Sequence, residues 1–218
     1  MCTIICMGNS YKNGGRCLAG IEIRRTATGY NVVRNVDGSP KWVRPVMSNG
    51  NQGIPESMVG SFDILDILDI RIIDNVPYGA HSENVRFARI DKIGHYNGSL
   101  SALCDESHSL IFGNRGKAVP EEIFCVGGYS LMFIRPTDIY IETQYDNYGH
   151  EKYRIQFTYK GRRYDFPLTD PKYISKLQRR YCKSGERNNE DIYLTISLGV
   201  NYNDWHYKLV AGVIDFAA

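Results

Sequence analysis

Apolar residues along the chain recur in short runs, many of them alternating with polar residues, and this spacing is typical of β-strands. The pattern predicts a mainly β protein. Gly161 lies between two of these runs and predicts a hairpin turn at 160–162. The expected strands are 2–7, 17–24, 30–34, 41–46, 84–92, 128–134, 138–144, 152–159, 163–168, 191–198 and 206–214.

Segment 62–73 fits two patterns. Its Asp residues recur every three positions, which suits a helix, but its Ile content and its lack of capping residues favour a strand. The clearest helix begins where Asp170 can cap the first turn and Pro171 suits the first position. Gly185 can end this helix. Its apolar face comprises Tyr173, Ile174, Leu177 and Tyr181, and a second, short helix is expected within 98–111.

Two pairs of short segments resemble each other along the chain. WVRPV at 42–46 is similar to FIRPT at 133–137, and CLAGI at 17–21 is similar to LVAGV at 209–213. Together they suggest two similar β units, at 1–125 and 126–218. The second unit has four expected strands, a helix and two more strands, and a five-stranded OB barrel carries its helix before the last two strands. We therefore expect two OB-like barrels packed in one compact protein, with one clear helix in the second.

Composition narrows the class of protein. The 218 residues are 43% hydrophobic and 23% charged, an ordinary globular balance. No apolar run approaches the roughly 20 residues of a membrane span, so we expect no membrane association. The apolar start lacks the basic leader of a signal peptide, which favours a first strand and a cytoplasmic protein. Six Cys occur without a Cys-x-x-Cys pair, so buried reduced thiols are favoured over disulfides.

Motifs for cofactors and metals are also missing from the sequence. The turn at 13–16 contains two Gly but lacks the Gly-Lys-Ser/Thr ending of a phosphate-binding P-loop, so a hairpin turn is favoured there. No His pair stands at zinc spacing, and no nucleophile motif of a hydrolase occurs. We expect no cofactor, no metal and no assigned catalytic residue.

The positive charge of the chain is concentrated in one segment. Residues 151–187 contain 11 Lys and Arg against 4 Asp and Glu, a net charge of +7, whereas the whole chain carries +2. Tyr residues interleave with these cations, and this combination suits phosphate contacts plus base stacking. A solvated helix face over a Tyr-rich core is the alternative. The candidate cations are Lys160, Arg162 and Arg163 at the hairpin and Lys176, Arg179 and Arg180 on the helix.

Further candidates lie outside this segment. Arg44 and Arg135 each precede a Pro, beside Trp42 and Phe133, and are candidate ligand contacts, one in each barrel. The alternative places them at strand ends with their side chains over apolar surface. Trp205, with His206 and Lys208, is a candidate stacking site, for which a barrel-end plug is the alternative. The nucleic-acid-binding candidates added here are Arg44, Arg135, Trp42, Trp205 and Lys208.

Several motifs occur in an order that is similar to a known family. They are NSYKNGGRCLAG at 9–20, KWVRPV at 41–46, LDILDI at 65–70, SENV at 82–85, LTDP at 168–171, YLTISLG at 193–199 and YKLVA at 207–211. Over about residues 2–214, this order resembles the bacterial dual OB-containing domain family. The resemblance implies two OB-like barrels and a nucleic-acid or nucleotide ligand, in an anti-phage or other genome-conflict system. It carries no catalytic residues over to this chain.

Three functional hypotheses follow. The first is a recognition subunit that binds single-stranded nucleic acid or a nucleotide-like anion and acts beside a separate effector protein. The second is a protein-interaction module that senses a phage protein or a partner subunit. The third is an enzyme acting on nucleotides through Asp170, Ser197 and Lys208.

Overall fold

Strands of the first half of the chain close into a barrel. The computed structural model describes residues 1–218 except 13, 48–52, 127–128, 180–184, 187–191 and 217–218, and the side chains of 124–126 and 185–186 are also outside the description. The barrel strands are β1 (Cys2–Lys12), β2 (Gly15–Thr26), β4 (Trp42–Val46), β5 (Asp66–Asn75) and β6 (Asn84–His95), with β3 (Gly29–Val32) as a short extension beside β2.

The order of strands around this barrel is that of an OB fold. Each of the five strands pairs with two others in the ring β1-β2-β4-β6-β5, and only the β4–β6 pairing is parallel. Counted in chain order, the ring is 1-2-3-5-4, the Greek-key closure of a five-stranded OB barrel. The short helix α1 (Glu56–Val59) lies between the third and fourth ring strands.

The second half of the chain follows the same order with one interruption. Its elements are β7 (Ala118–Pro120), β8 (Leu131–Ile134), β9 (Thr137–Tyr145), β10 (Glu151–Tyr159), β11 (Arg162–Pro167), α2 (Pro171–Arg179), β12 (Gly185–Glu186), β13 (Ile192–Leu198) and β14 (Trp205–Asp215). They form two four-stranded sheets, β11-β10-β9-β12 and β7-β14-β13-β8. Two 3-10 helices, η1 (Ser101–Leu103) and η2 (Ile111–Gly113), connect the two halves, and a third, η3 (Glu121–Val126), lies between β7 and β8.

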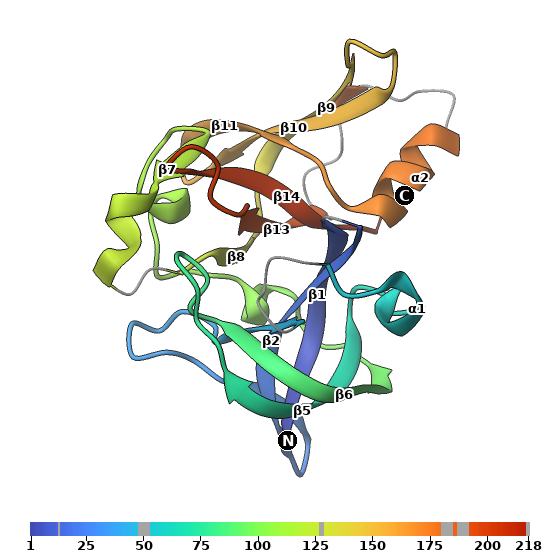
Figure 1. Cartoon of the computed structure of the whole chain (residues 1–218), viewed down its shortest axis with the longest axis vertical. Helices are drawn as coiled ribbons and strands as arrows, with labels where there is room; N and C mark the ends of the chain where they lie inside the picture. Colours follow the sequence, from blue (N-terminus) through green and yellow to red (C-terminus); the bar gives the residue numbers. More distant parts are fainter. Residues whose placement is uncertain (13, 48–52, 127–128, 180–184, 187–191, 217–218) are drawn as a thin grey trace.

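The break between these two sheets falls within one ring strand. Strands β8 and β9 are separated only by Arg135 and Pro136, and a Pro lacks the N–H that would continue a ladder. If β8 and β9 are counted as one strand, the ring is again 1-2-3-5-4. The parallel contact between its third and fifth strands is one isolated bridge, from Leu168 after β11 to Val210 of β14. The second unit is therefore a partly open OB-like barrel stacked on the closed one (Figure 1).

Most elements predicted from sequence are present. The ambiguous segment 62–73 contributes to a strand, β5, as preferred. Asp170 caps α2, because its Oδ1 accepts the backbone N–H groups of Lys172 and Tyr173 at 3.0 and 3.1 Å. The short helix expected within 98–111 is the 3-10 turn η1. Tyr181, predicted on the apolar face of α2, lies outside the described residues.

The two sequence echoes do not mark equivalent strands. Segment 42–46 is the third strand of the first ring, whereas 133–137 spans the break in the first strand of the second ring. Segment 17–21 belongs to the second strand of its ring and 209–213 to the fifth. The barrels share a topology, but these matches do not reflect it. Strand pairing also crosses residue 125, the predicted boundary, because β7 pairs with β14.

The barrels are joined through a shared core and direct hydrogen bonds. Ile5 and Met7 of β1 pack in one apolar cluster with Phe133 of β8. The Thr195 hydroxyl of β13 donates to the Met7 carbonyl at 2.6 Å. Where β14 passes β1, a Cβ on Gly212 would lie 2.4 Å from the same carbonyl oxygen, so only Gly allows this approach. The placement of one barrel on the other is therefore tightly defined.

Candidate functional site between the barrels

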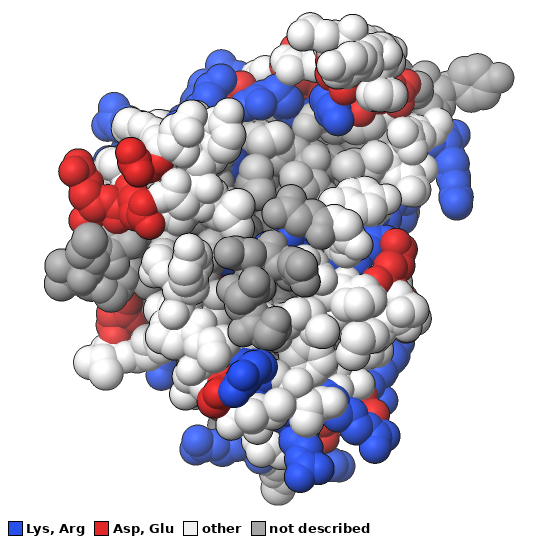
Figure 2. Space-filling view, in the orientation of Figure 1, with Lys and Arg blue, Asp and Glu red and all other residues white. Residues whose placement is uncertain are grey.

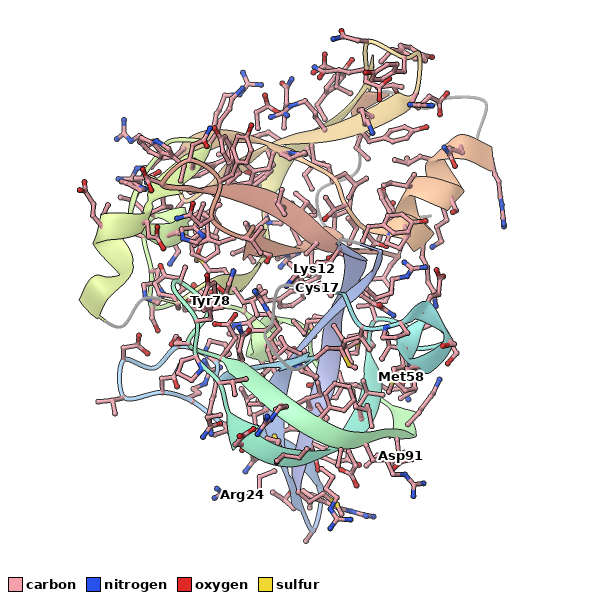
Figure 3. All side chains as sticks on the ribbon, viewed as in Figure 1. Lys12, Cys17, Arg24, Met58, Tyr78 and Asp91 are labelled. Carbon is pink, nitrogen blue, oxygen red and sulfur yellow. The ribbon has the colours of Figure 1, made fainter. Side chains whose placement is uncertain are left out.

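A cavity of about 270 Å³ lies where the two barrels meet. The first barrel contributes residues 10–12 at the end of β1, Cys17 in β2, Arg44 in β4 and His81 in the β5–β6 loop. The second barrel contributes residues 197–200 and Leu209. Figure 3 shows Lys12 and Cys17 at this junction, where the β1–β2 hairpin meets the upper barrel.

The cavity occupies the side of the first barrel on which OB folds hold their ligands. OB folds bind on the face of their second and third strands, between the loop joining strands one and two and the loop joining strands four and five. In this chain those strands are β2 and β4, and the second of those loops is 76–83. Cys17, Arg44 and His81 come from these three places. The first barrel thus directs its usual binding face toward the second barrel.

Arg44 is the centre of a buried polar network that links both barrels. Only 2% of its surface is exposed. Its Nη1 donates to His81 Nδ1 at 2.6 Å, and its Nη2 donates to the hydroxyls of Ser130 and Ser197 at 3.0 and 3.2 Å. The Glu83 carboxylate lies 3.1 Å from Nη2 and is also buried. A buried guanidinium is tolerable only when it is paired in this way.

His81 is held in its neutral form. Burial, together with the neighbouring charges of Arg44 and Lys12, lowers the pKa of its imidazole to about 2. Because the guanidinium only donates, Nδ1 of His81 is the acceptor, so we assign the ring proton to Nε2. A second ring, that of His206, meets it edge-on at 5.9 Å. His206 Nδ1 donates to the Gly199 carbonyl at 2.8 Å.

The charges around the cavity favour an anion. Lys12 and Arg44 are its charged lining residues, and none of the described lining residues is Asp or Glu. Burial is the main cause that lowers the pKa of the Lys12 amine, and the charge of Arg44 acts in the same direction, whereas Cys17 and Glu83 act in the opposite direction. Glu83, which pairs with Arg44 from outside the lining, offsets part of this positive charge, and an anion such as a phosphate or carboxylate would pair with the rest.

With this geometry in view, the comparison with protein families is decisive. Residues 2–213 match the family described as dual OB-containing domain. The chain belongs to this family. The two ring orders found here are the two OB units that its description states. The comparisons with curated proteins and with solved structures find no match. As a dual OB protein, the chain has the architecture of a binding module.

The basic hairpin of this dual OB protein packs on its own surface. The Lys160 amine donates to the carbonyls of Glu106 and His108, each at 3.0 Å, and Arg162 Nη1 donates to the Ser109 carbonyl at 3.2 Å. Arg163, on the opposite face of β11, is exposed. Two of the three predicted hairpin cations are therefore held by backbone carbonyls of the 105–109 segment.

The basic helix lies apart from the hairpin. Lys176 and Arg179 are exposed on α2. The 160–161 turn lies at the start of β11, whereas α2 follows the end of that strand (Figure 1). Six residues of strand span roughly 20 Å, so the structure does not bring the two groups into one patch. Figure 2 shows Lys and Arg side chains spread around the rim of this face, not gathered on it. Arg180 lies outside the described residues.

The remaining predicted residues have different surroundings. Arg135 is exposed, with its guanidinium 5.8 Å from the centre of the Tyr193 ring. Trp42 packs in the apolar cluster shared by the barrels. Trp205 is 44% exposed, which does not fit a barrel-end plug. Of these candidates and Arg44, only Arg44 lines the cavity.

Lys208 is an internal residue. It is fully buried, and its Nζ donates to the Ile111 carbonyl at 2.7 Å and to the carbonyl and side-chain oxygens of Asn114 at 2.9 and 2.8 Å. Burial lowers the pKa of this amine to about 8. An ammonium group has three N–H donors, and these three acceptors use all of them. The predicted contact of Lys208 with a phosphate on the surface does not fit this placement.

Sequence reasoning missed Lys12, His81 and Glu83. Lys12 precedes the Gly-Gly turn for which a hairpin was favoured over a P-loop, and its position beside that hairpin was the available signal. His81 is 37 residues from its partner Arg44 in sequence, and Ser197 is 153 residues from it. No local pattern connects residues at such separations. Across the described residues, we also find no helix with both the length and the apolar character needed to cross a membrane.

Proposed function

We propose that this protein binds single-stranded nucleic acid, or a nucleotide-like anion, in the cavity between its two barrels. The observation that carries the proposal is the placement of Lys12 and Arg44 on the OB binding face, in a cavity whose described lining residues include no carboxylate. OB folds hold single strands by combining cations for the backbone with aromatic rings for the bases. The cavity supplies both kinds of group.

The two cations have different roles in this proposal. Arg44 is held by Glu83 and by two hydroxyls, so its guanidinium is a fixed part of the cavity wall. Lys12 is partly exposed and stands at the end of β1 beside the turn into β2. We assign to Lys12 the direct contact with a phosphate oxygen. The burial that lowers its pKa also strengthens that contact once an anion is present.

Tyr11 is the aromatic surface at this cavity. It lines the cavity, yet its side chain is largely exposed, and the guanidinium of Arg16 lies 4.7 Å from the centre of its ring. An exposed ring backed by a cation is a suitable platform for a base. The cavity volume is just below the roughly 300–1,000 Å³ of small-molecule pockets, which suits one nucleotide unit with the rest of a strand outside.

The family resemblance supplies the biological part of the proposal. A recognition subunit in an anti-phage or genome-conflict system requires a separate effector protein, and we propose that ligand binding at the cavity is reported to such a partner. We develop no catalytic proposal from Asp170, Ser197 and Lys208, because each has its own partners. Asp170 caps α2, Ser197 accepts from Arg44, and Lys208 donates to backbone carbonyls.

The test is fluorescence anisotropy with labelled single-stranded DNA, single-stranded RNA and duplex DNA. We expect single strands to bind more tightly than the duplex, with affinity falling steeply between about 50 and 200 mM salt, as phosphate contacts require. The Lys12→Gln substitution is expected to weaken binding about tenfold, because it removes one desolvated charge-assisted contact. The matched control is Lys176→Gln, which removes one exposed charge from α2.

Two outcomes would overturn the proposal. One is the lack of binding by any of the three probes and by a mononucleotide at the lower salt concentration. The other is a loss of affinity in Lys176→Gln that equals the loss in Lys12→Gln, because the ligand would then contact the basic helix and not the cavity. Circular dichroism of each variant shows whether its fold is intact.

A further inference from the structure

Aromatic rings are exposed together at the end of the second barrel. Trp205 and Tyr207 are 44% and 48% exposed and share the outer face of β14, whereas His206 between them is buried. Tyr202, in the β13–β14 loop, is 65% exposed, and the centre of its ring lies 6.5 Å from that of Tyr207. A cluster of three exposed aromatic side chains is unusual on a surface without a partner. The three rings therefore indicate a binding surface.

Carboxylates border these rings on one side. A groove of about 550 Å³ is lined by Trp205 together with Glu121, Glu122 and Asp204. The Glu121 N–H donates to the Asp204 carbonyl at 2.9 Å, which fixes η3 against the β13–β14 loop. In Figure 2, acidic side chains gather on the left of the molecule, over the region that η3 occupies in Figure 1. We call the three aromatic residues and these three acids the aromatic–acidic surface.

The acids of this surface have few partners among the described residues, where Asn201 Nδ2 donates to Glu121 Oε2. Within the described residues, none of them forms an ion pair, although acids elsewhere do, such as Asp66 with Lys92 and Asp165 with Arg154. The first barrel reaches the same region. Its β5–β6 loop carries the exposed Tyr78, labelled at this side in Figure 3, and a Cβ on the next residue, Gly79, would lie 3.8 Å from Glu121 Oε1.

We infer that the aromatic–acidic surface docks a Lys- or Arg-bearing segment of a partner protein. A guanidinium or ammonium group placed over the Trp205 indole gains a cation–π contact, and the carboxylates beside the ring bind the same cation through charge-assisted hydrogen bonds. A nucleic-acid backbone does not suit this place, since three carboxylates would repel its phosphates. The surface is separate from the cavity in its residues, so the inference stands without the proposed function.

Trp205 itself provides the first readout. The chain has two Trp residues, and Trp42 is buried, so a Trp42→Phe background leaves Trp205 as the only indole emitter. We expect a peptide of six Arg residues to quench this emission, with saturation below about 1 mM, and a peptide of six Glu residues to leave it unchanged. Equal responses to both peptides, or no response to the Arg peptide up to that concentration, would overturn the inference.

Charge removal at the surface gives the second readout. Anisotropy of a fluorescein-labelled six-Arg peptide is measured on the variant Glu121→Gln, Glu122→Gln and Asp204→Asn, for which we expect an affinity about tenfold lower. Asn suits position 204, because its φ of 64° is one that Asn tolerates. The control variant, Asp91→Asn, Asp138→Asn and Glu106→Gln, changes the net charge equally at sites outside this surface and is expected to bind as the wild type does.

The aromatic contribution is tested separately. Trp205→Leu keeps an apolar side chain but removes the ring face, and its affinity for the labelled peptide is expected to fall about two- to fivefold. If the control charge variant loses as much affinity as the surface variant, binding depends on net charge alone and the inference fails. It also fails if single-stranded DNA, and not the Arg peptide, quenches Trp205, since the rings would then stack bases.

Discussion

Arg44 and Arg135 stand in the same sequence motif, each before a Pro and near an aromatic residue, yet the structure places them in opposite surroundings. Arg44 is buried, contacts four side chains and joins both barrels. Arg135 lies at the break between β8 and β9, exposed over the ring of Tyr193. The difference arises because the second barrel covers Arg44 on β4, whereas Arg135 occupies the point where the second ring opens.

The surroundings of a cation in the fold, and not its neighbours in sequence, therefore decide whether its side chain is fixed by protein acceptors or exposed to solvent. The same division separates Lys208, which is buried with three acceptors, from Lys176, which is exposed on α2. Four predictions test the division between the buried and exposed groups.

The largest effect is expected at Arg44. In Arg44→Met, Glu83 remains buried without its cation, and breaking a buried pair in this way costs about 3–5 kcal/mol of unfolding free energy. Arg135→Met is the matched control and is expected to change stability by less than about 0.5 kcal/mol. Urea denaturation measures both. Similar losses for the two variants would refute the comparison.

The next effect is expected at Lys208. In Lys208→Met, the carbonyls of Ile111 and Asn114 lose their donor while remaining inside the protein, at a cost of about 2–3 kcal/mol. Lys176→Met, on the exposed face of α2, is expected to stay within about 0.5 kcal/mol of wild type. Thermal and urea denaturation should rank the two variants in this order. An unchanged stability in Lys208→Met would mean that water replaces the amine.

A pH dependence is expected from His81. Its pKa is about 2 in the folded protein against about 6.5 when unfolded, so the unfolded chain binds the extra proton first. The stability that this provides is complete above the unfolded value and is lost as pH falls below it. The loss between pH 7.5 and 5 is about 2 kcal/mol.

Substitution of His81 isolates this contribution. In His81→Asn, the stability profile between pH 7.5 and 5 should flatten by about the same 2 kcal/mol, although the variant is less stable overall. His150 is exposed beside Asp146, and His150→Asn should leave the slope unchanged. Urea denaturation at several pH values gives the slopes. A wild-type profile that is already flat in this range would contradict the buried, neutral imidazole.

The smallest effect is expected from the exposed cations. The double variant Arg163→Gln and Arg179→Gln should change the unfolding free energy by less than about 0.5 kcal/mol. It should also weaken single-strand binding by less than about threefold, since these residues lie away from the cavity and contribute only a screened, long-range field. Anisotropy at about 150 mM salt tests this. A larger loss would restore the basic hairpin and helix as the binding surface.

Local patterns were sufficient to predict the elements and insufficient to predict the site. Alternation over a few residues located β10 and β11 and the turn between them, and the sequence Asp170-Pro171 located the start of α2. Each of these signals acts within one or two turns of chain. The cavity depends instead on contacts such as Arg44 with Ser197, which only the closure of both barrels creates.

The charge prediction failed for a related reason. Lys160 and Lys176 are close in sequence, but β11 separates the turn from the helix. The cations that are clustered along the chain are therefore not clustered on the surface. Burial was also invisible in the pattern at Lys208, whose aromatic neighbours Trp205 and Tyr207 are exposed while it points inward. Alternation along a strand gives two faces, but it does not state which of them is inside.

Gly212 of β14 lies directly against Met7 of β1, where the two barrels meet. Since this contact fixes the barrels against each other, the cavity exists before any ligand arrives, and binding requires no closure of one barrel on the other. The walls come from both ends of the chain, so an occupant of the cavity must be released before either barrel unfolds. At a concentration one hundred times its Kd, such a ligand raises the unfolding free energy of the whole chain by about 2.7 kcal/mol. The melting temperature of the intact protein is therefore a detector for its own ligand, whatever the chemistry of that ligand.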